Sequence, residues 1–550
     1  MLQPLNGPRL AAFIDLGTNS VRLLIVRVNP NHSYHVLSEQ KETVRLGAEA
    51  FVLRKLQPEA MDRAVVALRQ FAEMARRMGV EEIVAVATAA TREAQNRRIF
   101  IDKVRREAGL EMKVISGPEE ARLIYRGVSS TMDLKGRTAL FIDIGGGSTE
   151  LALGDGGDPR FLDSLKLGAI RVTNEFLGDA SEAVGNQLYE VMLRHVRHLS
   201  VRAVERLTRL PFQLTVGSSG TIESLAQLEA ANFGGDGATV SAEGLGRVAR
   251  LIYSLPIAER RKVAGLNPAR ADIIIGGVAI LQGLMSGLKI DRVSVSGRGL
   301  KDGLLADWLG RTEAGRASAD LSLRERGVFQ FGRSVNFDEP HARTVARIAL
   351  ELFDSGRAIG IHRRNDAERE LLYFAALLHD CGAFLSYHNH HAHGHYFIRN
   401  ADLLGFTQEE LEVMAVTVLF HRKEYPRKKV HPEFAALDPK AQDAVRVLCV
   451  LLRMAESLDR SHSGVVKKAE FREGTDGTVA LELTADRDCS LEYWGVRRHH
   501  KAFEKSFGRR LTESCAWVSE PEVNPPRRRK AQEPSARPPR SGPKKATPKG

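Results

Sequence analysis

Two short segments of this chain carry nearly the same sequence, one near residue 15 and the other near residue 143. Each is an apolar run that ends in Asp-x-Gly and continues with small hydroxyl or glycine residues: Phe13–Ser20 and Phe141–Ser148. An apolar run that ends in a single Asp is typical of a buried strand with a carboxylate at its end. The residues after it predict a tight turn whose backbone N–H groups face an anion. The repeat therefore predicts two lobes that hold phosphate between them.

Strand and helix patterns alternate around both turns, which favours an α/β architecture. In the first lobe we expect strands over 9–14, 21–28, 35–44, 83–87 and 113–115, with helices over 58–78 and 96–108. In the second we expect a hairpin from 138–142 and 150–153, strands over 214–216 and 292–296, and helices over 272–285 and 299–309. Helical periodicity dominates from 321 to 458, and β and helix patterns follow over 465–482 and 501–513.

The length and composition describe a globular chain of several domains. At 550 residues, two to four domains are expected. The chain contains no run of about 18 apolar residues, so we expect no membrane span. No apolar leader precedes the first strand, so we expect no secretory signal. The four cysteines are scattered without a Cys-x-x-Cys pair, which favours reduced thiols in a cytoplasm: Cys381, Cys449, Cys489 and Cys515.

The net charge of +12 is concentrated at the C-terminus. Nine basic residues, one acidic residue and seven prolines lie between 524 and 550. A segment of this composition cannot build a core, so we expect a disordered tail over 519–550. It could tether the chain weakly to a polyanion, or it could be no more than a solvated end.

Five segments, in order, resemble the Ppx/GppA family of exopolyphosphatases and guanosine pentaphosphate phosphohydrolases. They are Asp15–Ser20, Ala87–Ala94, Ser116–Arg122, Asp143–Glu150 and Gly217–Thr221. The resemblance covers about residues 10–310 and implies two actin-like (ribonuclease H-like) lobes around a central cleft. The chain departs from the family pattern at Leu300-Lys301-Asp302-Gly303, where the family usually carries Leu-Arg-Glu-Gly.

The chemistry of the matched residues suits hydrolysis of a phosphoanhydride, which needs charge neutralisation and a positioned water. Arg92 can give phosphate a bidentate fork, although alone it could be a surface residue. Asp143 and Glu150 could bring two carboxylates to one hard cation such as Mg²⁺. The expected phosphate-binding residues are Asp15, Gly17, Thr18, Asn19, Ser20, Arg92, Gly145, Gly146, Gly147, Ser148, Gly217 and Ser219.

The family resemblance implies that Glu120 is the general base that acts on the attacking water. From the residues alone, Glu119-Glu120 could equally be an exposed acidic pair at a helix start, where acids favour the helix dipole. Asp15 could merely cap a turn, and Ser148 could merely satisfy the backbone of one.

The helical segment carries a pair, His379-Asp380, that resembles the paired ligands of the HD phosphohydrolase superfamily. His341 fits the upstream position of that superfamily and Asp459 the downstream one, which predicts a second divalent-metal site. His391 or its neighbours, and His421, could add ligands to a further metal, and imidazole and carboxylate ligands suit Mn, Fe or Zn as well as Mg. The alternative is a helical platform for dimerisation and polyphosphate binding whose histidines only pack or lie at the surface.

These features predict one lobe over 1–134, a second over 135–312, and an all-α HD-like domain with a small α+β portion over 318–518. We expect a Mg²⁺-dependent exopolyphosphatase that releases terminal phosphate from inorganic polyphosphate. The alternative substrate is guanosine pentaphosphate (pppGpp), and an alternative of another class is an actin-like ATP-binding or sensor protein. The expected partners are the substrate and a second copy of the chain, without membrane or specific nucleic acid.

Overall fold

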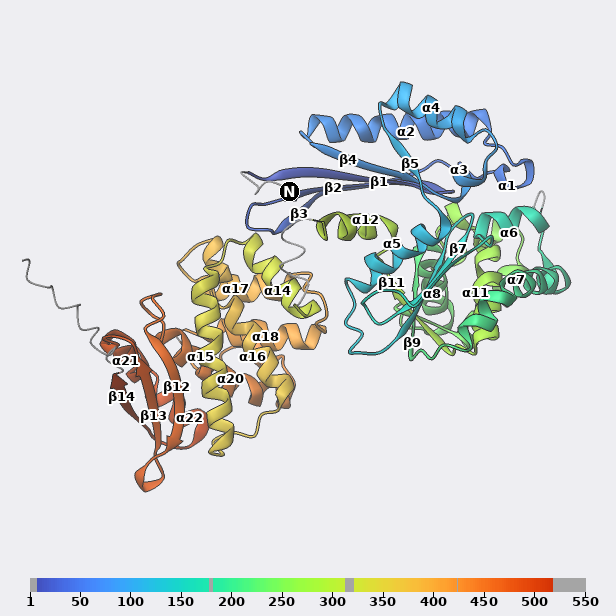
Figure 1. Ribbon diagram of the computed structural model, residues 1–550. Coiled ribbons are helices and arrows are strands. Elements are labelled where there is room, and N and C mark those ends of the chain that lie inside the picture. The colour runs from blue at the N-terminus through green and yellow to red at the C-terminus, as the bar shows by residue number, and fades with distance from the viewer. Residues whose placement is uncertain (1–6, 178–181, 312–320, 423, 518–550) are drawn as a thin grey trace, which may run out of the picture.

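The computed structural model describes residues 7–177, 182–311, 321–422 and 424–517 (Figure 1). The basic tail predicted for 519–550 lies outside these residues. Two α/β lobes, which we call the first lobe (7–134) and the second lobe (135–311), are followed by a helical domain (321–517). The α/β fold class, with helices dominating after the second lobe, is confirmed.

The described part of the first lobe forms a five-stranded sheet in the order β3-β2-β1-β4-β5. Its first three strands are antiparallel, whereas β4 and β5 run parallel to β1. The strands are β1 (Arg9–Leu16), β2 (Ser20–Val28), β3 (Tyr34–Thr43), β4 (Glu82–Ala87) and β5 (Met112–Val114). The helices are α1 (Ala50–Leu53), α2 (Pro58–Arg77), α3 (Ala89–Glu93), α4 (Arg97–Ala108) and α5 (Gly117–Ser129).

The helix α2 illustrates how the sequence sets these elements. Proline at its first position lacks an N–H that would go unpaired there, and Gly79, with φ +77°, follows its end. The apolar side chains between these points recur at helical spacing and are buried on the sheet, among them Ala64, Leu68 and Phe71.

The described part of the second lobe repeats the plan with a six-stranded sheet in the order β10-β11-β9-β6-β7-β8. The strands are β6 (Ala139–Ile144), β7 (Thr149–Gly154), β8 (Phe161–Leu165), β9 (Leu214–Ser218), β10 (Thr239–Ser241) and β11 (Arg292–Ser296). The helices are α6 (Ala169–Phe176), α7 (Gly185–Leu207), α8 (Ser219–Phe233), α9 (Ala242–Ser254), α10 (Ile257–Arg260), α11 (Ile274–Leu288) and α12 (Leu300–Leu309). The predicted hairpin is present as β6 and β7.

Two helices tie the lobes together. Helix α5 of the first lobe packs on β7 and β8, and α12 of the second lobe packs on α5 and on β1, beneath the first sheet (Figure 1). A Cβ atom on Gly303 would lie 1.9 Å from the carbonyl oxygen of Leu123, and one on Gly127 would lie 2.4 Å from that of Gly299. Only glycine allows the two helices to approach so closely, which explains the glycine of the Leu-Lys-Asp-Gly segment.

The helical domain has one core of helices with a small sheet at its far end (Figure 1). Capping boxes begin three of its helices, at Ser322, Asn365 and Thr407. The helices are α14 (Leu323–Ser334), α15 (Glu339–Ala358), α16 (Asp366–Leu378), α17 (His390–Asn400), α18 (Gln408–Leu419), α19 (Pro432–Ala435), α20 (Pro439–Ser457), α21 (Ser490–Arg497) and α22 (His500–Phe507). The strands are β12 (Val466–Glu473), β13 (Val479–Ala485) and β14 (Leu511–Trp517).

The helical domain contacts both lobes. Gln330 on α14 exchanges two hydrogen bonds with the backbone of Tyr34 on β3, at 2.6 and 3.1 Å. Arg298, which precedes α12, forms an ion pair with Asp402 at 2.7 Å. These contacts place the helical domain at the β3 edge of the first lobe and beside the segment that precedes α12 in the second lobe.

Candidate active site

The repeated segments form matching hairpin turns. In the first lobe the Gly17 N–H donates to the Ser20 carbonyl at 2.9 Å, and in the second the Gly145 N–H donates to the Ser148 carbonyl at 3.0 Å. A Cβ atom on either glycine would lie 3.2 Å from the same serine oxygen. The Asp-x-Gly repeat therefore encodes one backbone conformation used twice.

The two turns lie against each other. A Cβ atom on Gly146 would lie 3.1 Å from Thr18 Cβ, and one on Gly147 would lie 2.4 Å from Phe51 Cζ and 2.7 Å from Thr18 Oγ1. Larger residues at these positions would push the lobes apart, so the glycines bring the backbone amides of both turns to one place.

A strand carboxylate stands beside each turn, and its cross-strand partner differs between the lobes. Asp15 pairs in register with Arg22, whereas Asp143 pairs with Glu150. Asp143 accepts a hydrogen bond from Ser218 Oγ at 2.5 Å, and Glu150 accepts one from Ser164 Oγ at 2.8 Å. The buried Oδ1 atom of Asp15 has no hydrogen-bond partner.

Glu120 reaches this cluster from the first turn of α5. Arg92 Nη1 donates to Glu120 Oε2 at 2.8 Å and also to the carbonyl of Ile115 at 3.1 Å, so the arginine fixes one oxygen of the carboxylate. Glu119 points elsewhere, because both of its oxygens are bound by Arg122 at 2.8 Å. The alternative of an exposed acidic pair at a helix start therefore applies to Glu119 alone, because only 7% of Glu120 is exposed.

Burial makes the carboxylates of this cluster costly to ionise. It raises the pKa of Asp15 to about 6 and that of Glu120 to about 7. It also raises the pKa of Asp143, and it raises that of Glu150 well above its ordinary value, with the charges of Glu120 and Asp143 adding to the effect. Buried carboxylate oxygens, one of them unpartnered, are the ligand type that a hard divalent cation prefers. The residues present therefore fit such a cation in kind, although no three of these oxygens in the described chain lie within 4.8 Å of one another.

A pocket between the lobes joins these groups. Of the predicted residues, Arg92, Glu150 and Gly217 do not line it. Arg92 is hydrogen-bonded to the lining residue Glu120, and Glu150 pairs in register with the lining residue Asp143, while a Cβ atom on Gly217 would meet the core side chains of Ile222 and Val293. The predicted residues that do line it are Asp15, Gly17, Thr18, Asn19, Ser20, Glu120, Asp143, Gly145, Gly146, Gly147, Ser148 and Ser219.

Sequence reasoning missed several residues that line the pocket. Arg22 follows the first turn, Arg270 and Glu223 come from the second lobe, and Arg298 precedes α12. A signal was available for Arg22, because it is a charged residue within an apolar strand, seven positions after Asp15. Arg270 ends the short 3-10 helix Pro268–Arg270 and Arg298 lies in an irregular segment, and neither stretch is long enough for periodicity to mark a direction.

Family models match nearly the whole described chain. The model of the Ppx/GppA phosphatase family matches residues 24–312, and that of Ppx/GppA phosphatase domain III matches residues 323–494. The chain belongs to the Ppx/GppA phosphatase family. The resemblance inferred from the five segments is confirmed, and with it a hydrolase that acts on phosphoanhydride bonds. Membership of this family does not support the alternative of an actin-like ATP-binding or sensor protein.

Solved structures are similar to this chain over a little more than half of its length. An exopolyphosphatase from Cytophaga hutchinsonii is 25% identical, with a TM-score of 0.51, over 56% of this chain and 99% of its own. An exopolyphosphatase-like protein is 28% identical, with a TM-score of 0.50, over 55% of this chain and 98% of its own. The Aquifex aeolicus PPX-GPPA enzyme is 26% identical, with a TM-score of 0.46, over 54% of this chain and 99% of its own.

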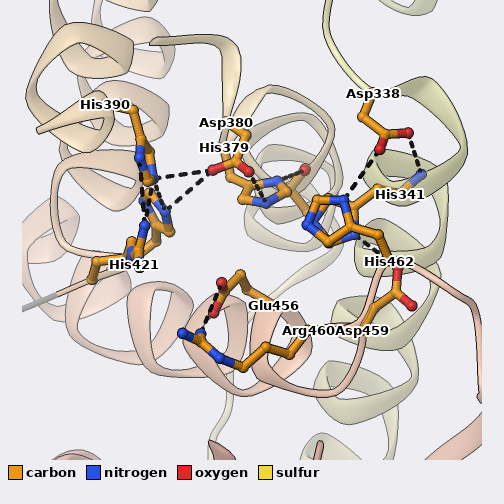
Figure 2. Close-up of polar contacts among 12 residues, drawn as sticks. Asp338, His341, His379, Asp380, His390, His421, Glu456, Asp459, Arg460 and His462 are labelled. Atoms are coloured by element: carbon orange, nitrogen blue, oxygen red, sulfur yellow. Dashed lines mark hydrogen bonds and ion pairs between the residues drawn. The ribbon is translucent and has the colours of Figure 1, made fainter. Parts of the chain in front are cut away.

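The remaining predicted ligands of this Ppx/GppA phosphatase lie in domain III, the helical domain. His341, His379 and Asp380 lie together, whereas Asp459 is hydrogen-bonded to His341 and stands outside the group of ligand atoms. Two further histidines, His390 and His421, lie on the other side of Asp380 (Figure 2).

Among the helices of the described ranges, none is long and apolar enough to cross a membrane.

Proposed function

We propose that this chain is a Mg²⁺-dependent exopolyphosphatase that releases terminal orthophosphate from inorganic polyphosphate. One observation carries the choice of substrate. The pocket is lined by glycine amides, hydroxyls, carboxylates, arginines and a few aliphatic side chains, and none of its described lining residues is aromatic. A guanine base is commonly held by stacking on an aromatic ring, whereas a phosphate chain needs only charge and N–H donors.

In this mechanism Glu120 is the general base. Arg92 occupies its Oε2 atom and leaves Oε1 for the attacking water, whose proton the carboxylate accepts. A pKa of about 7 suits a base that must be ionised near neutral pH and still hold a proton.

The end of the substrate is held by the two turns. Backbone N–H groups of Gly146–Ser148 and of Thr18–Ser20, with the hydroxyls of Thr18 and Ser148, surround the terminal phosphoryl group. Arg22 and Arg270 neutralise negative charge on the phosphate chain. Asp143 and Glu150, with Asp15 across the cleft, would hold Mg²⁺, which supplies charge neutralisation to the phosphoryl oxygens.

The test is phosphate release by the full chain from polyphosphate and from guanosine pentaphosphate, measured as kcat/KM. Glu120→Gln, purified in parallel, corrects for contaminating phosphatases. We expect a higher kcat/KM for polyphosphate. A higher value for guanosine pentaphosphate would overturn the substrate while leaving the reaction class intact.

The homodimer and a cytoplasmic location stay predictions.

A further inference from the structure

Arg298 belongs both to the cleft between the lobes and to the contact with the helical domain. It lies in the short segment between β11 and α12 and lines the pocket. Its Nη2 atom donates to Asp402 Oδ2 at 2.7 Å, and Asp402 follows α17 in the helical domain. Among the lining residues that the structure describes, Arg298 alone forms an ion pair with that domain. The ion pair therefore joins the helical domain to one wall of the cleft.

A second carboxylate binds the same guanidinium group. Arg298 Nη1 donates to Asp302 Oδ1 at 3.3 Å, and the other oxygen of Asp302 accepts the Gly299 N–H at 2.8 Å. The side chain of Asp302 is 9% exposed, whereas that of Asp402 is 80% exposed. An exposed ion pair contributes little free energy, so Asp402 is the partner that Arg298 can release at low cost.

The surroundings of Arg298 differ from those of the other two arginines in the pocket. Burial, and next the nearby charge of Arg22, lowers the pKa of Arg270, so these two cations act together on one part of the pocket. Arg298 instead stands beside two aspartates, and the three charges sum to a negative value. A phosphate chain at this wall is attracted by Arg298 and repelled by both carboxylates.

We propose that Arg298 is a substrate-binding residue for which Asp402 and the phosphate chain compete. The inference rests on the proposed function, because it concerns the phosphoanhydride chain held in the same cleft. When a chain enters, one of its oxygens replaces Asp402 on Nη2, while Asp302 keeps Nη1 in place. The guanidinium suits this exchange because it carries several N–H donors in a fixed plane. Asp402 is then a positioning residue that lowers the affinity of the cleft for phosphate chains.

The backbone that carries Asp402 is fixed on both sides. Leu403 is buried in the core of the helical domain, and Arg324 Nε donates to the Gly405 carbonyl at 2.9 Å. A Cβ atom on Gly405 would lie 3.6 Å from Asp133 Cβ in the first lobe. The exchange on Arg298 therefore needs only rotation of side chains that are already in part exposed.

The test measures affinity for inorganic tripolyphosphate, a phosphate chain that polyphosphate and guanosine pentaphosphate both contain. Titration calorimetry uses the full chain with Glu120→Gln, which suppresses hydrolysis, at constant Mg²⁺ and ionic strength. We expect Asp402→Asn to tighten binding about three- to fivefold, as for loss of an exposed ion pair. Arg298→Gln should weaken binding about fivefold or more, because a charged donor is lost. In the Arg298→Gln background, Asp402→Asn should change the affinity by no more than about twofold.

Two further variants separate the ion pair from a general effect of charge. Asp402→Glu keeps the carboxylate and should retain an affinity within about twofold of that with Asp402. The matched control is Glu409→Gln, because Glu409 is exposed in the first turn of α18 and the variant also removes one negative charge from the helical domain. It should leave the affinity within about twofold, since solvent and salt screen exposed charges. Circular dichroism in the near ultraviolet checks that each variant is folded.

The outcomes separate this inference from the proposed function. Unchanged or weaker binding in Asp402→Asn would overturn the inference and leave the proposed function standing. An equal gain from Asp402→Asn in the Arg298→Gln background would do the same, because the effect would then not pass through Arg298. Failure of the Glu120→Gln chain to bind tripolyphosphate would overturn both.

Discussion

Asp143 and Glu150 face each other across the β6–β7 hairpin, at the register position that Asp15 and Arg22 occupy in the β1–β2 hairpin. The two backbones are alike, yet the first pair is neutral overall and the second carries two acids. A buried pair of like charges favours a cation between or beside them. The duplicated turn therefore gives a cleft with two different sides.

The sharpest test of the general base compares neighbouring glutamates. Glu120→Gln is expected to lower kcat for phosphate release at least about a hundredfold, because the amide cannot accept the proton of water. Glu119→Gln should leave kcat within about twofold, since Glu119 is paired with Arg122 outside the cluster. Steady-state phosphate release measures both. Equal losses in the two variants would exclude the assignment.

The pH profile should depend on Arg92. The charge and hydrogen bond of Arg92 lower the pKa of Glu120 against the larger effect of burial. Arg92→Gln is therefore expected to move the acidic limb of kcat/KM to higher pH. The control is Arg98→Gln, because Arg98 is exposed on α4. An unmoved limb in Arg92→Gln would separate Arg92 from the titrating group.

The ionised carboxylate of Glu120 should lower the free energy of unfolding. Burial raises the pKa of Glu120 from 4.5 to about 7, so the folded chain binds this proton more tightly than the unfolded chain. The ionised group therefore destabilises the fold above pH 7, and the effect fades as the pH falls toward 4.5. Glu120→Gln in metal-free protein is expected to raise the free energy of unfolding by up to about 3 kcal/mol at pH 8, and by much less at pH 5. Calorimetric unfolding measures this, and Glu119→Gln, whose carboxylate has a lowered pKa, should show no gain.

The Mg²⁺ requirement should respond to Glu150. Glu150→Gln is expected to raise the Mg²⁺ concentration for half-maximal phosphate release at least about tenfold, because one negative ligand is lost. Asp163→Asn, on the adjacent strand β8, is the control and should change it little, since Asp163 pairs in register with Leu151 rather than Glu150 and forms an ion pair with Arg206. An unchanged Mg²⁺ dependence in Glu150→Gln would place the cation elsewhere.

The contact between the turns should not tolerate a methyl group. Gly147→Ala would place Cβ 2.4 Å from Phe51 Cζ and 2.7 Å from Thr18 Oγ1, so these side chains or the turn itself must shift. We expect kcat/KM to fall about tenfold or more, as for overpacking of about 1–3 kcal/mol. Gly157→Ala is the control, because the nearest atom to its Cβ would be Asp155 Oδ1 at 3.5 Å.

Much of the fold could be read from local patterns. The hairpins, the long amphipathic helix α2 and the helical domain follow from periodicity and from turn and capping residues, which act within a few positions. Strand β8 was not predicted, because Phe161–Leu165 is short and carries two adjacent polar residues, and helix α7 over Gly185–Leu207 was not predicted either. The packing of α12 under the first lobe was also out of reach, since a close contact between Gly303 and Leu123 leaves no trace in local periodicity.

The sequence by itself determined the two Asp-x-Gly turns, their carboxylates and the family, because these depend on residues adjacent in the chain. Only the tertiary structure decided which carboxylates share a cluster. It separated Glu120 from Glu119 and placed Arg92 on the former. It also placed Asp459 against the Nδ1 atom of His341, and it brought His390 and the expected His421 beside Asp380. The physical reason is that burial, charge coupling and ligand geometry depend on distances between atoms, and segments far apart in the chain set those distances only when it folds.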